Sequence, residues 1–152
     1  MKKILILIIV VLASALYFHD ELKQIISPTE VTVKYEDLIE RDGLRYQKFS
    51  AVPFTGEVTG KKDGSFKNGK KEGAWVSYYD NGQLEYKGNF KNGKREGAWV
   101  YYYDNGQLSS KGNVKNGKEE GLWVSYWGDG AQMYRNYYEN GKLVICLNCS
   151  GL

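Results

Sequence analysis

The chain has 152 residues, of which 42% are hydrophobic and 14% aromatic, so it is not an intrinsically disordered chain and can form one domain with a moderate core. Its net charge is +3, from 21 basic and 18 acidic residues, and without a strongly basic stripe we expect no nucleic-acid partner. One His and two Cys leave little material for catalysis or metal binding, so we expect no enzyme activity, no metal and no cofactor.

The N-terminal segment has the features of a targeting sequence. Lys2-Lys3 precedes an apolar run, and Ala13-Ser14-Ala15 resembles a small-residue cleavage site. This layout is typical of a secretory signal peptide, so we expect residues 1–15 to be removed on export. An uncleaved membrane anchor over residues 4–18 is the alternative, although a spanning helix needs roughly 20 residues. The predicted location is therefore the periplasm, the cell surface or the medium, or the membrane itself.

Two short regions separate this leader from the rest of the chain. Residues 16–28 are expected to form a linker or a short helix that ends before Pro28, because the residue preceding proline disfavours a helix. Residues 29–63 contain short alternating stretches and a hairpin signal at Asp42-Gly43. We therefore predict that residues 29–63 form a degenerate N-terminal cap of a β-sheet.

A period of 24 residues dominates the remainder of the chain. Trp75, Trp99 and Trp123 recur in register, each preceded by Lys-Asn-Gly-Lys and Glu-Gly. Self-similarity at a fixed period indicates a repeat architecture. The copies span residues 64–87, 88–111 and 112–135, with a partial copy at 136–142 and a tail at 143–152.

The first two repeats each contain two Asn-Gly pairs between alternating apolar and polar residues, which is the strongest short-range signal for a β-hairpin. We therefore expect an all-β fold, an elongated single-layer antiparallel meander of 24-residue hairpin repeats, preceded by an N-terminal signal or anchor helix. With two-residue loops, the expected cross-strand pairs are Tyr79–Leu84, Ser77–Tyr86 and Trp75–Gly88 across one turn, and Tyr86–Trp99, Gly88–Gly97 and Phe90–Arg95 across the next.

Strand alternation places the large aromatic side chains of every repeat on one face of this sheet. Trp75 is expected to cover Gly88, as an aromatic ring does when it compensates for a glycine in a strand. This face either packs upon itself as ladders of rings or leaves part of its surface open to a partner. The candidate partner-binding aromatics are Trp75, Tyr79, Trp99, Tyr101, Tyr103, Trp123 and Trp127.

The repeat motif also carries a family resemblance. The pattern Gly-x-Trp-x-x-Tyr-Tyr-x-Asn-Gly-Gln-Leu at residues 73–84, followed by residues 88–97, resembles the bacterial variant of the MORN repeat. Leu44-Arg45-Tyr46 together with residues 53–58 is similar to the opening of the YwqK-family antitoxins. The resemblance covers residues 36–142, and it implies a β-hairpin sheet used for protein or membrane contact, without catalytic residues.

Three features that resemble chemical sites are expected to be structural. The glycine-rich run at residues 64–71 lacks the Ser or Thr and the helix of a P-loop, so we interpret it as a hairpin turn. Glu72, Glu96 and Glu120 recur beside a turn and are expected to be structural or solubilising. Cys146 and Cys149 form a lone CxxC, which supplies two of the four ligands of a structural zinc. A local disulfide is expected in an oxidising compartment, with free thiols or partner contact as alternatives.

The sequence thus predicts a non-enzymatic, exported or membrane-tethered β-repeat scaffold that contacts a protein or the cell envelope. One alternative is a neutralising partner of a toxin, which the family resemblance implies. The other is a lipid-surface module, because lysines at the turns would be attracted to anionic lipids. The expected partner is a protein that the sequence does not identify, with a membrane surface as the alternative and no small-molecule cofactor.

Overall fold

A computed structural model describes residues 31–147. The predicted signal or anchor helix, the linker at residues 16–28 and Cys149 lie outside these residues. Twelve β-strands and one 3-10 turn make up the described part of the chain. In that part, no helix has the length and apolar character needed to cross a membrane.

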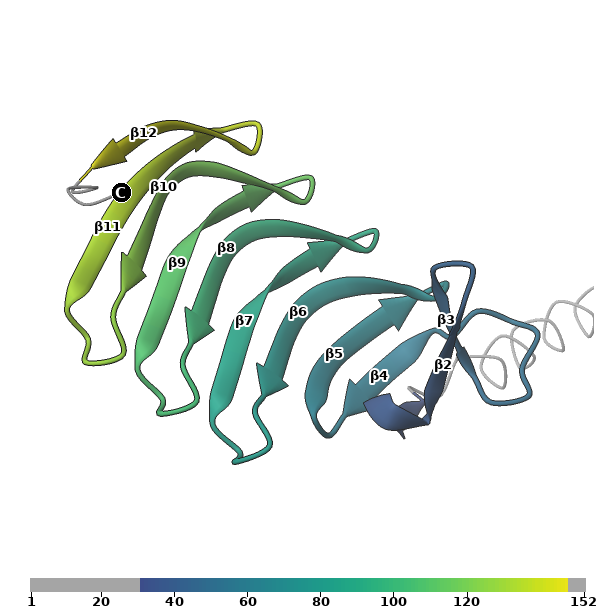
Figure 1. Cartoon of the computed structure of the whole chain (residues 1–152). Coiled ribbons are helices and arrows are strands. Elements are labelled where there is room, and N and C mark those ends of the chain that lie inside the picture. Colours follow the sequence, from purple (N-terminus) through teal and green to yellow (C-terminus); the bar gives the residue numbers. More distant parts are fainter. Residues whose placement is uncertain (1–30, 148–152) are drawn as a thin grey trace, which may run out of the picture. The chain divides into compact units, whose positions relative to one another are not determined.

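Ten strands form a single sheet in the order β1-β4-β5-β6-β7-β8-β9-β10-β11-β12 (Figure 1). From β4 onward each strand pairs antiparallel with the next, which confirms the predicted meander. The strands of this sheet are β1 (Thr32–Lys34), β4 (Gly56–Thr59), β5 (Lys62–Lys67), β6 (Lys70–Tyr78), β7 (Leu84–Lys91), β8 (Lys94–Tyr102), β9 (Leu108–Lys115), β10 (Lys118–Tyr126), β11 (Gln132–Glu139) and β12 (Lys142–Leu147).

The segment at residues 29–63 joins this sheet in part. Strand β1 pairs with β4 in parallel at the edge of the sheet. Between them, the 3-10 turn η1 (Tyr35–Asp37) leads into β2 (Leu38–Arg41) and β3 (Leu44–Gln47), which form a separate two-stranded sheet. Leu38 of β2 is buried with Phe54 and Val58, so this hairpin closes the N-terminal end of the core.

The two Asn-Gly turns of each repeat have different geometries. At Asn92-Gly93 both residues have positive φ angles, 51° and 80°, as a two-residue type I′ hairpin requires, so the prediction for this loop is confirmed. At Asn81-Gly82 the predicted two-residue loop is wrong. Tyr79 N–H donates to the Gln83 carbonyl (2.8 Å) and Gly82 N–H to the Tyr79 carbonyl (2.9 Å), so three residues form a type I turn that ends in a left-handed glycine.

This longer loop shifts the register at one end of the hairpin. Trp75–Gly88 and Ser77–Tyr86 pair as expected, but Leu84 lies opposite Tyr78 rather than Tyr79. The extra residue forms a β-bulge at Glu85. Because residues at a bulge do not alternate strictly, Glu85 turns to the same face as Ser77, whose hydroxyl donates to the Glu85 carboxylate at 2.6 Å.

A larger irregularity separates β7 from β8. Phe90–Arg95 pairs as expected, but Tyr86 lies opposite Tyr101, so the predicted Tyr86–Trp99 pair is wrong. The predicted pair of Gly88 with Gly97 is also absent from this strand pair, because Gly97 adopts a left-handed φ of 73°. Extra residues there bend the strand, and the same bend is visible in β6, β8 and β10 (Figure 1).

This bend decides which tryptophan covers which glycine. A Cβ atom placed on Gly88 would lie 2.4 Å from the Trp99 ring, whereas a Cβ on Gly64 would meet Trp75 at the same distance. The expected cover of Gly88 by Trp75 is therefore wrong, although the two residues are cross-strand neighbours. Each indole instead lies over the strand that precedes its own, so the tryptophans link each hairpin to the one before it.

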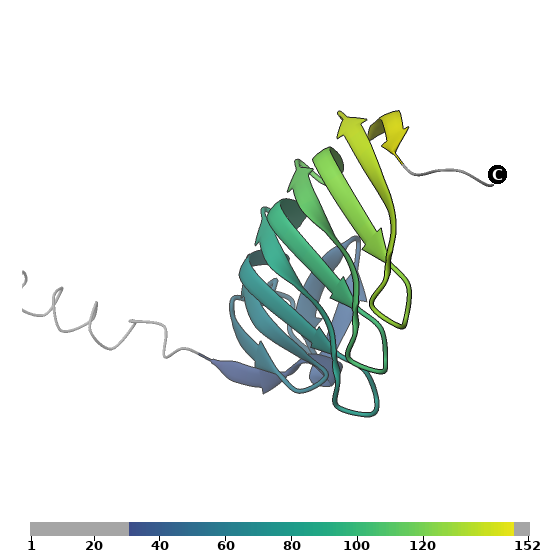
Figure 2. The ribbon, with the colours of Figure 1, turned by 90° about the vertical axis from the view of Figure 1, so that its left-hand side faces the viewer.

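The recurring glutamates also link neighbouring hairpins, which confirms their structural role. Glu72 accepts a hydrogen bond from the backbone N–H of Asn92 at 2.7 Å. The equivalent bonds join Glu96 to Asn116 and Glu120 to Asn140, both at 2.8 Å. Each carboxylate therefore fixes the type I′ turn of the next repeat. Seen from the side, the hairpins follow one another in a single layer (Figure 2).

Candidate binding groove

A groove of about 470 Å³ lies on the aromatic face of the sheet, over strands β7 to β11 and the β6–β7 loop. A volume of this size is within the range of about 300–1,000 Å³ that is usual for ligand sites. Its walls are aromatic and hydroxyl-bearing, and the side chains that define them best are Tyr101, Tyr103, Trp123, Ser125, Tyr134 and Tyr138.

Three of the predicted partner-binding aromatics form the core of the sheet. The exposed fractions of Trp75, Trp99 and Trp123 are 1%, 2% and 6%. Phe90 lies between two of them, with its ring centroid 5.9 Å from that of Trp75 and 5.1 Å from that of Trp99. Of these tryptophans Trp123 reaches the groove, while Trp75 and Trp99 support it from within the core.

The predicted tyrosines are placed where a partner can touch them. Tyr101 is half-buried and stacks on Trp99 with the ring centroids 5.8 Å apart. Tyr79 and Tyr103 line one end of the groove, and their hydroxyls donate to the carbonyls of Tyr102 and Tyr126 at 2.7 and 2.8 Å. These bonds hold the tyrosine rings rigidly, and a rigid aromatic ring loses little conformational entropy when a partner binds.

Trp127 lies apart from these residues. It occupies the loop between β10 and β11 and is 54% exposed. Its position in the repeat is that of Tyr79 and Tyr103, but it is not among the residues that line the groove. Trp127 is therefore a separate exposed aromatic at the end of the sheet.

Polar groups in the groove have mixed charge. Arg95 donates to the Tyr101 hydroxyl at 2.8 Å, and Glu119 holds the corresponding position of the next repeat. Burial and the nearby Glu85 carboxylate raise the pKa of Tyr79, so its phenol stays a hydrogen-bond donor. The groove walls thus carry a basic side chain, Arg95, and two acidic side chains, Glu85 and Glu119.

Asn136 occupies the repeat position at which Gly64, Gly88 and Gly112 are each covered by a tryptophan ring. Its Nδ2 atom donates to the Tyr138 hydroxyl at 3.2 Å, whereas its buried Oδ1 atom has no hydrogen-bond partner among residues 31–147. Buried polar atoms are rarely left unpaired. Because this oxygen is shielded from solvent, its unmet hydrogen bond is a cost of placing asparagine where the earlier repeats have glycine.

Sequence reasoning missed several of these groove residues. Arg95, Glu119, Tyr134, Asn136 and Tyr138 were not among the candidates, because the eroded third repeat and the bulges obscure which side chains share a face. The repeat alignment does carry one signal for the opening. Ser110 of β9 occupies the repeat position that Tyr86 holds in β7. The small serine side chain leaves space at that position.

The cysteine of the CxxC motif that the structure describes, Cys146, is not among the residues that line the groove. In residues 31–147, no group of three or more His, Cys, Asp or Glu side chains is placed to hold a metal ion. Cys146 lies in β12 and Cys149 lies outside the described residues, so a disulfide between them remains a prediction.

A single open sheet of consecutive hairpins, stabilised by contacts between neighbouring repeats, defines an open β-repeat protein. The MORN repeat variant family matches residues 71–92, 95–116 and 133–148. The first two matches cover the hairpins β6–β7 and β8–β9, and the third covers β11–β12. MORN repeats are in general scaffold modules that bind proteins or membranes. No curated protein matches the chain.

Proposed function

We propose that this protein is a non-enzymatic scaffold that binds an extended segment of a protein partner in the groove over β7 to β11. The observation that supports this most directly is the row of half-buried tyrosines Tyr101, Tyr103, Tyr134 and Tyr138 along the groove walls. Tyrosine is enriched among the residues that dominate binding energy at protein interfaces.

The charges of the groove favour a peptide over a lipid surface. Membrane-surface modules collect basic residues on one face, whereas Arg95 and Glu119 both line this groove. Together with the aromatic walls, these opposite charges suit a peptide segment better than a uniformly anionic lipid surface.

The experiment that tests this function is selection of peptides from a display library on the purified protein. We expect the selected peptides to lose at least tenfold in affinity when Ser110→Tyr fills the groove, a change that copies Tyr86 of the preceding repeat and so suits the fold. Tyr137→Ala is the matched control, because Tyr137 is 43% exposed and alternates to the opposite face from Tyr138. Equal affinities for the two variants would refute the proposal, and salt-sensitive vesicle binding in both would favour the lipid-surface alternative.

We further propose that the protein acts outside the cytoplasm, either released or tethered by its N-terminus. The leader at residues 1–15, with its basic start and apolar run, supports this location. Intact-mass measurement of the mature protein, combined with cell fractionation, tests it. A chain that begins at Leu16 indicates export, and an intact chain in the membrane fraction indicates an anchor. An intact chain in the cytosol contradicts the proposal, and the toxin-neutralising alternative would then lead.

A further inference from the structure

Three cationic side chains converge on one tyrosine at the N-terminal end of the aromatic face. Tyr35 of η1 packs against Trp75 with the ring centroids 6.1 Å apart. The ring centroid of Tyr35 lies 5.3 Å from Arg45 Cζ, 5.1 Å from Lys62 Nζ and 5.9 Å from Lys71 Nζ. These residues come from β3, β5 and β6, so the fold brings together charges that are distant in sequence. None of the three lines the groove.

Within the described part of the chain, two of these cations lack a negative partner. Arg45 forms an ion pair with Glu40 at 2.8 Å. Among residues 31–147, no carboxylate oxygen lies within the 4.0 Å of an ion pair from Lys62 or Lys71. The cluster therefore carries a net charge of about +2 when both ammonium groups are protonated.

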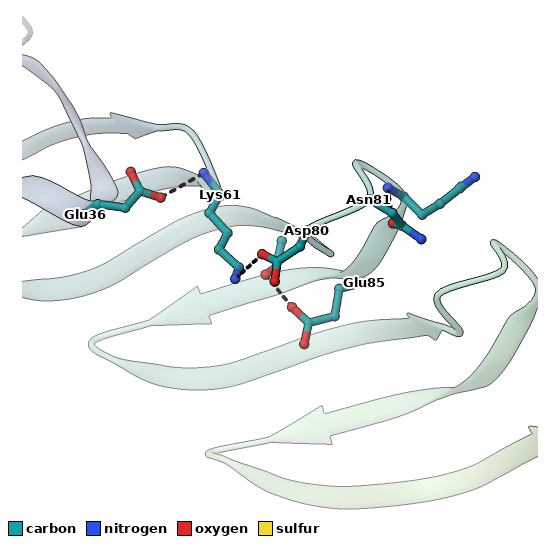
Figure 3. Close-up of polar contacts among 7 residues, drawn as sticks. Glu36, Lys61, Asp80, Asn81 and Glu85 are labelled. Atoms are coloured by element: carbon teal, nitrogen blue, oxygen red, sulfur yellow. Dashed lines mark hydrogen bonds and ion pairs between the residues drawn. The ribbon is translucent and has the colours of Figure 1, made fainter.

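Nearby carboxylates are engaged by the neighbouring Lys61 (Figure 3). Glu36 accepts a hydrogen bond from the Lys61 backbone N–H at 3.0 Å, and Asp80 pairs with Lys61 Nζ at 2.6 Å. Asp63, next along β5, accepts a hydrogen bond from the Gly60 N–H at 3.1 Å and interacts with Tyr78, whose pKa it helps to raise. These carboxylates do not neutralise Lys62 or Lys71.

Lys71 is also partly removed from water. Its Nζ atom lies 4.3 Å from the Trp75 ring centroid and 4.7 Å from that of Phe90. Burial, and then the charges of Lys62 and Arg45, lower the pKa of Lys71 to about 8. Cation–π contacts stabilise such an ammonium, but repulsion between like charges opposes the arrangement until an anion binds.

We propose that Arg45, Lys62 and Lys71 form a binding site for a phosphate monoester or free phosphate, independent of the groove. The charge of the cluster selects this ligand, because a phosphate monoester is largely dianionic at neutral pH and matches the two unpaired lysines. A monoanionic carboxylate would leave one lysine charge uncompensated. The guanidinium of Arg45 adds donors suited to phosphate oxygens.

NMR of the side-chain ammonium groups in the full chain, during titration with inorganic phosphate at pH 7.5 and constant ionic strength, tests this site. We expect saturable shifts at Lys62 and Lys71, and a rise in the pKa of Lys71 from about 8 toward its ordinary 10.5. We expect Lys71→Met and Lys62→Met each to weaken phosphate binding at least tenfold. Lys70→Met is the matched control: this exposed neighbour carries the same charge, and its loss should change affinity less than twofold.

A parallel titration with phenyl phosphate distinguishes the sources of the phosphate group. Tighter binding of phenyl phosphate than of inorganic phosphate indicates an ester ligand, and equal binding indicates the free anion. Two results overturn the proposal. One is the absence of saturable shifts with either probe. The other is an equal loss of affinity in the Lys70 and Lys71 variants, which would show that phosphate responds to net charge alone.

Discussion

Substitution of Gly88 by alanine tests the contact that links each hairpin to the one before it. The new Cβ would lie 2.4 Å from the Trp99 ring, so the indole or the strand must move. Overpacking of this kind costs about 1–3 kcal/mol, or about 4–12 °C in Tm for a domain of this size. Gly88 does not have a positive φ, so backbone strain does not contribute to this cost.

Gly128→Ala is the matched control for this experiment. Gly128 also lacks a positive φ, and a Cβ there would meet Asn105 at an ordinary 3.8 Å. Both variants share the stabilisation that alanine brings by restricting the unfolded chain, so the difference between them isolates the clash. Urea unfolding followed by far-UV circular dichroism measures both free energies of unfolding.

A double-mutant cycle identifies the tryptophan involved. In a Trp99→Leu background the ring is gone, and Gly88→Ala should then cost less than about 0.5 kcal/mol, whereas a Trp75→Leu background should leave the full cost in place. Equal costs for Gly88→Ala and Gly128→Ala, or rescue by Trp75→Leu instead of Trp99→Leu, would show that Trp99 does not cover Gly88.

Three further predictions concern bonds and charges. Glu96→Ala removes the acceptor for the Asn116 N–H and should lower the free energy of unfolding by about 0.5–1.5 kcal/mol; an unchanged urea midpoint would contradict its role at the turn. Tyr103→Phe removes the hydroxyl that donates to the Tyr126 carbonyl and should cost a similar amount in the same assay, with unchanged stability as the opposing result. The pKa of Lys71 is about 8 in the folded chain against an ordinary 10.5, so the unfolded chain binds more protons between these values and stability should rise with pH there. Thermal unfolding should show this rise in the wild type and not in Lys71→Met, and equal pH profiles would contradict it.

The repeat architecture could be predicted from the sequence because its signals are local and recur in phase. Trp75, Trp99 and Trp123 mark the period, and alternation around Asn92-Gly93 specifies a hairpin. The loop at Asn81-Gly82 was mispredicted because the same dipeptide also ends a type I turn. The difference lies in Asp80 before it, where the other turn has lysine.

The groove and the cationic cluster could not be predicted, because both depend on geometry that alternation does not contain. Left-handed glycines such as Gly97 introduce bulges, and these change which side chains share a face. Tyr35 of η1 contacts Trp75 of β6, which lies forty residues further along the chain. Nothing in the local sequence around Tyr35 indicates that contact.

Site-specific photo-crosslinking in the native cells can show whether a protein partner occupies the groove. A photoreactive phenylalanine analogue replaces Tyr134, in the groove wall, or Tyr137, which is 43% exposed on the opposite face of the same strand. If a partner binds in the groove, position 134 should give one discrete protein adduct that is lost on Ser110→Tyr, and position 137 should give none of that species. The same adduct from both positions, or from 137 alone, would contradict binding in the groove.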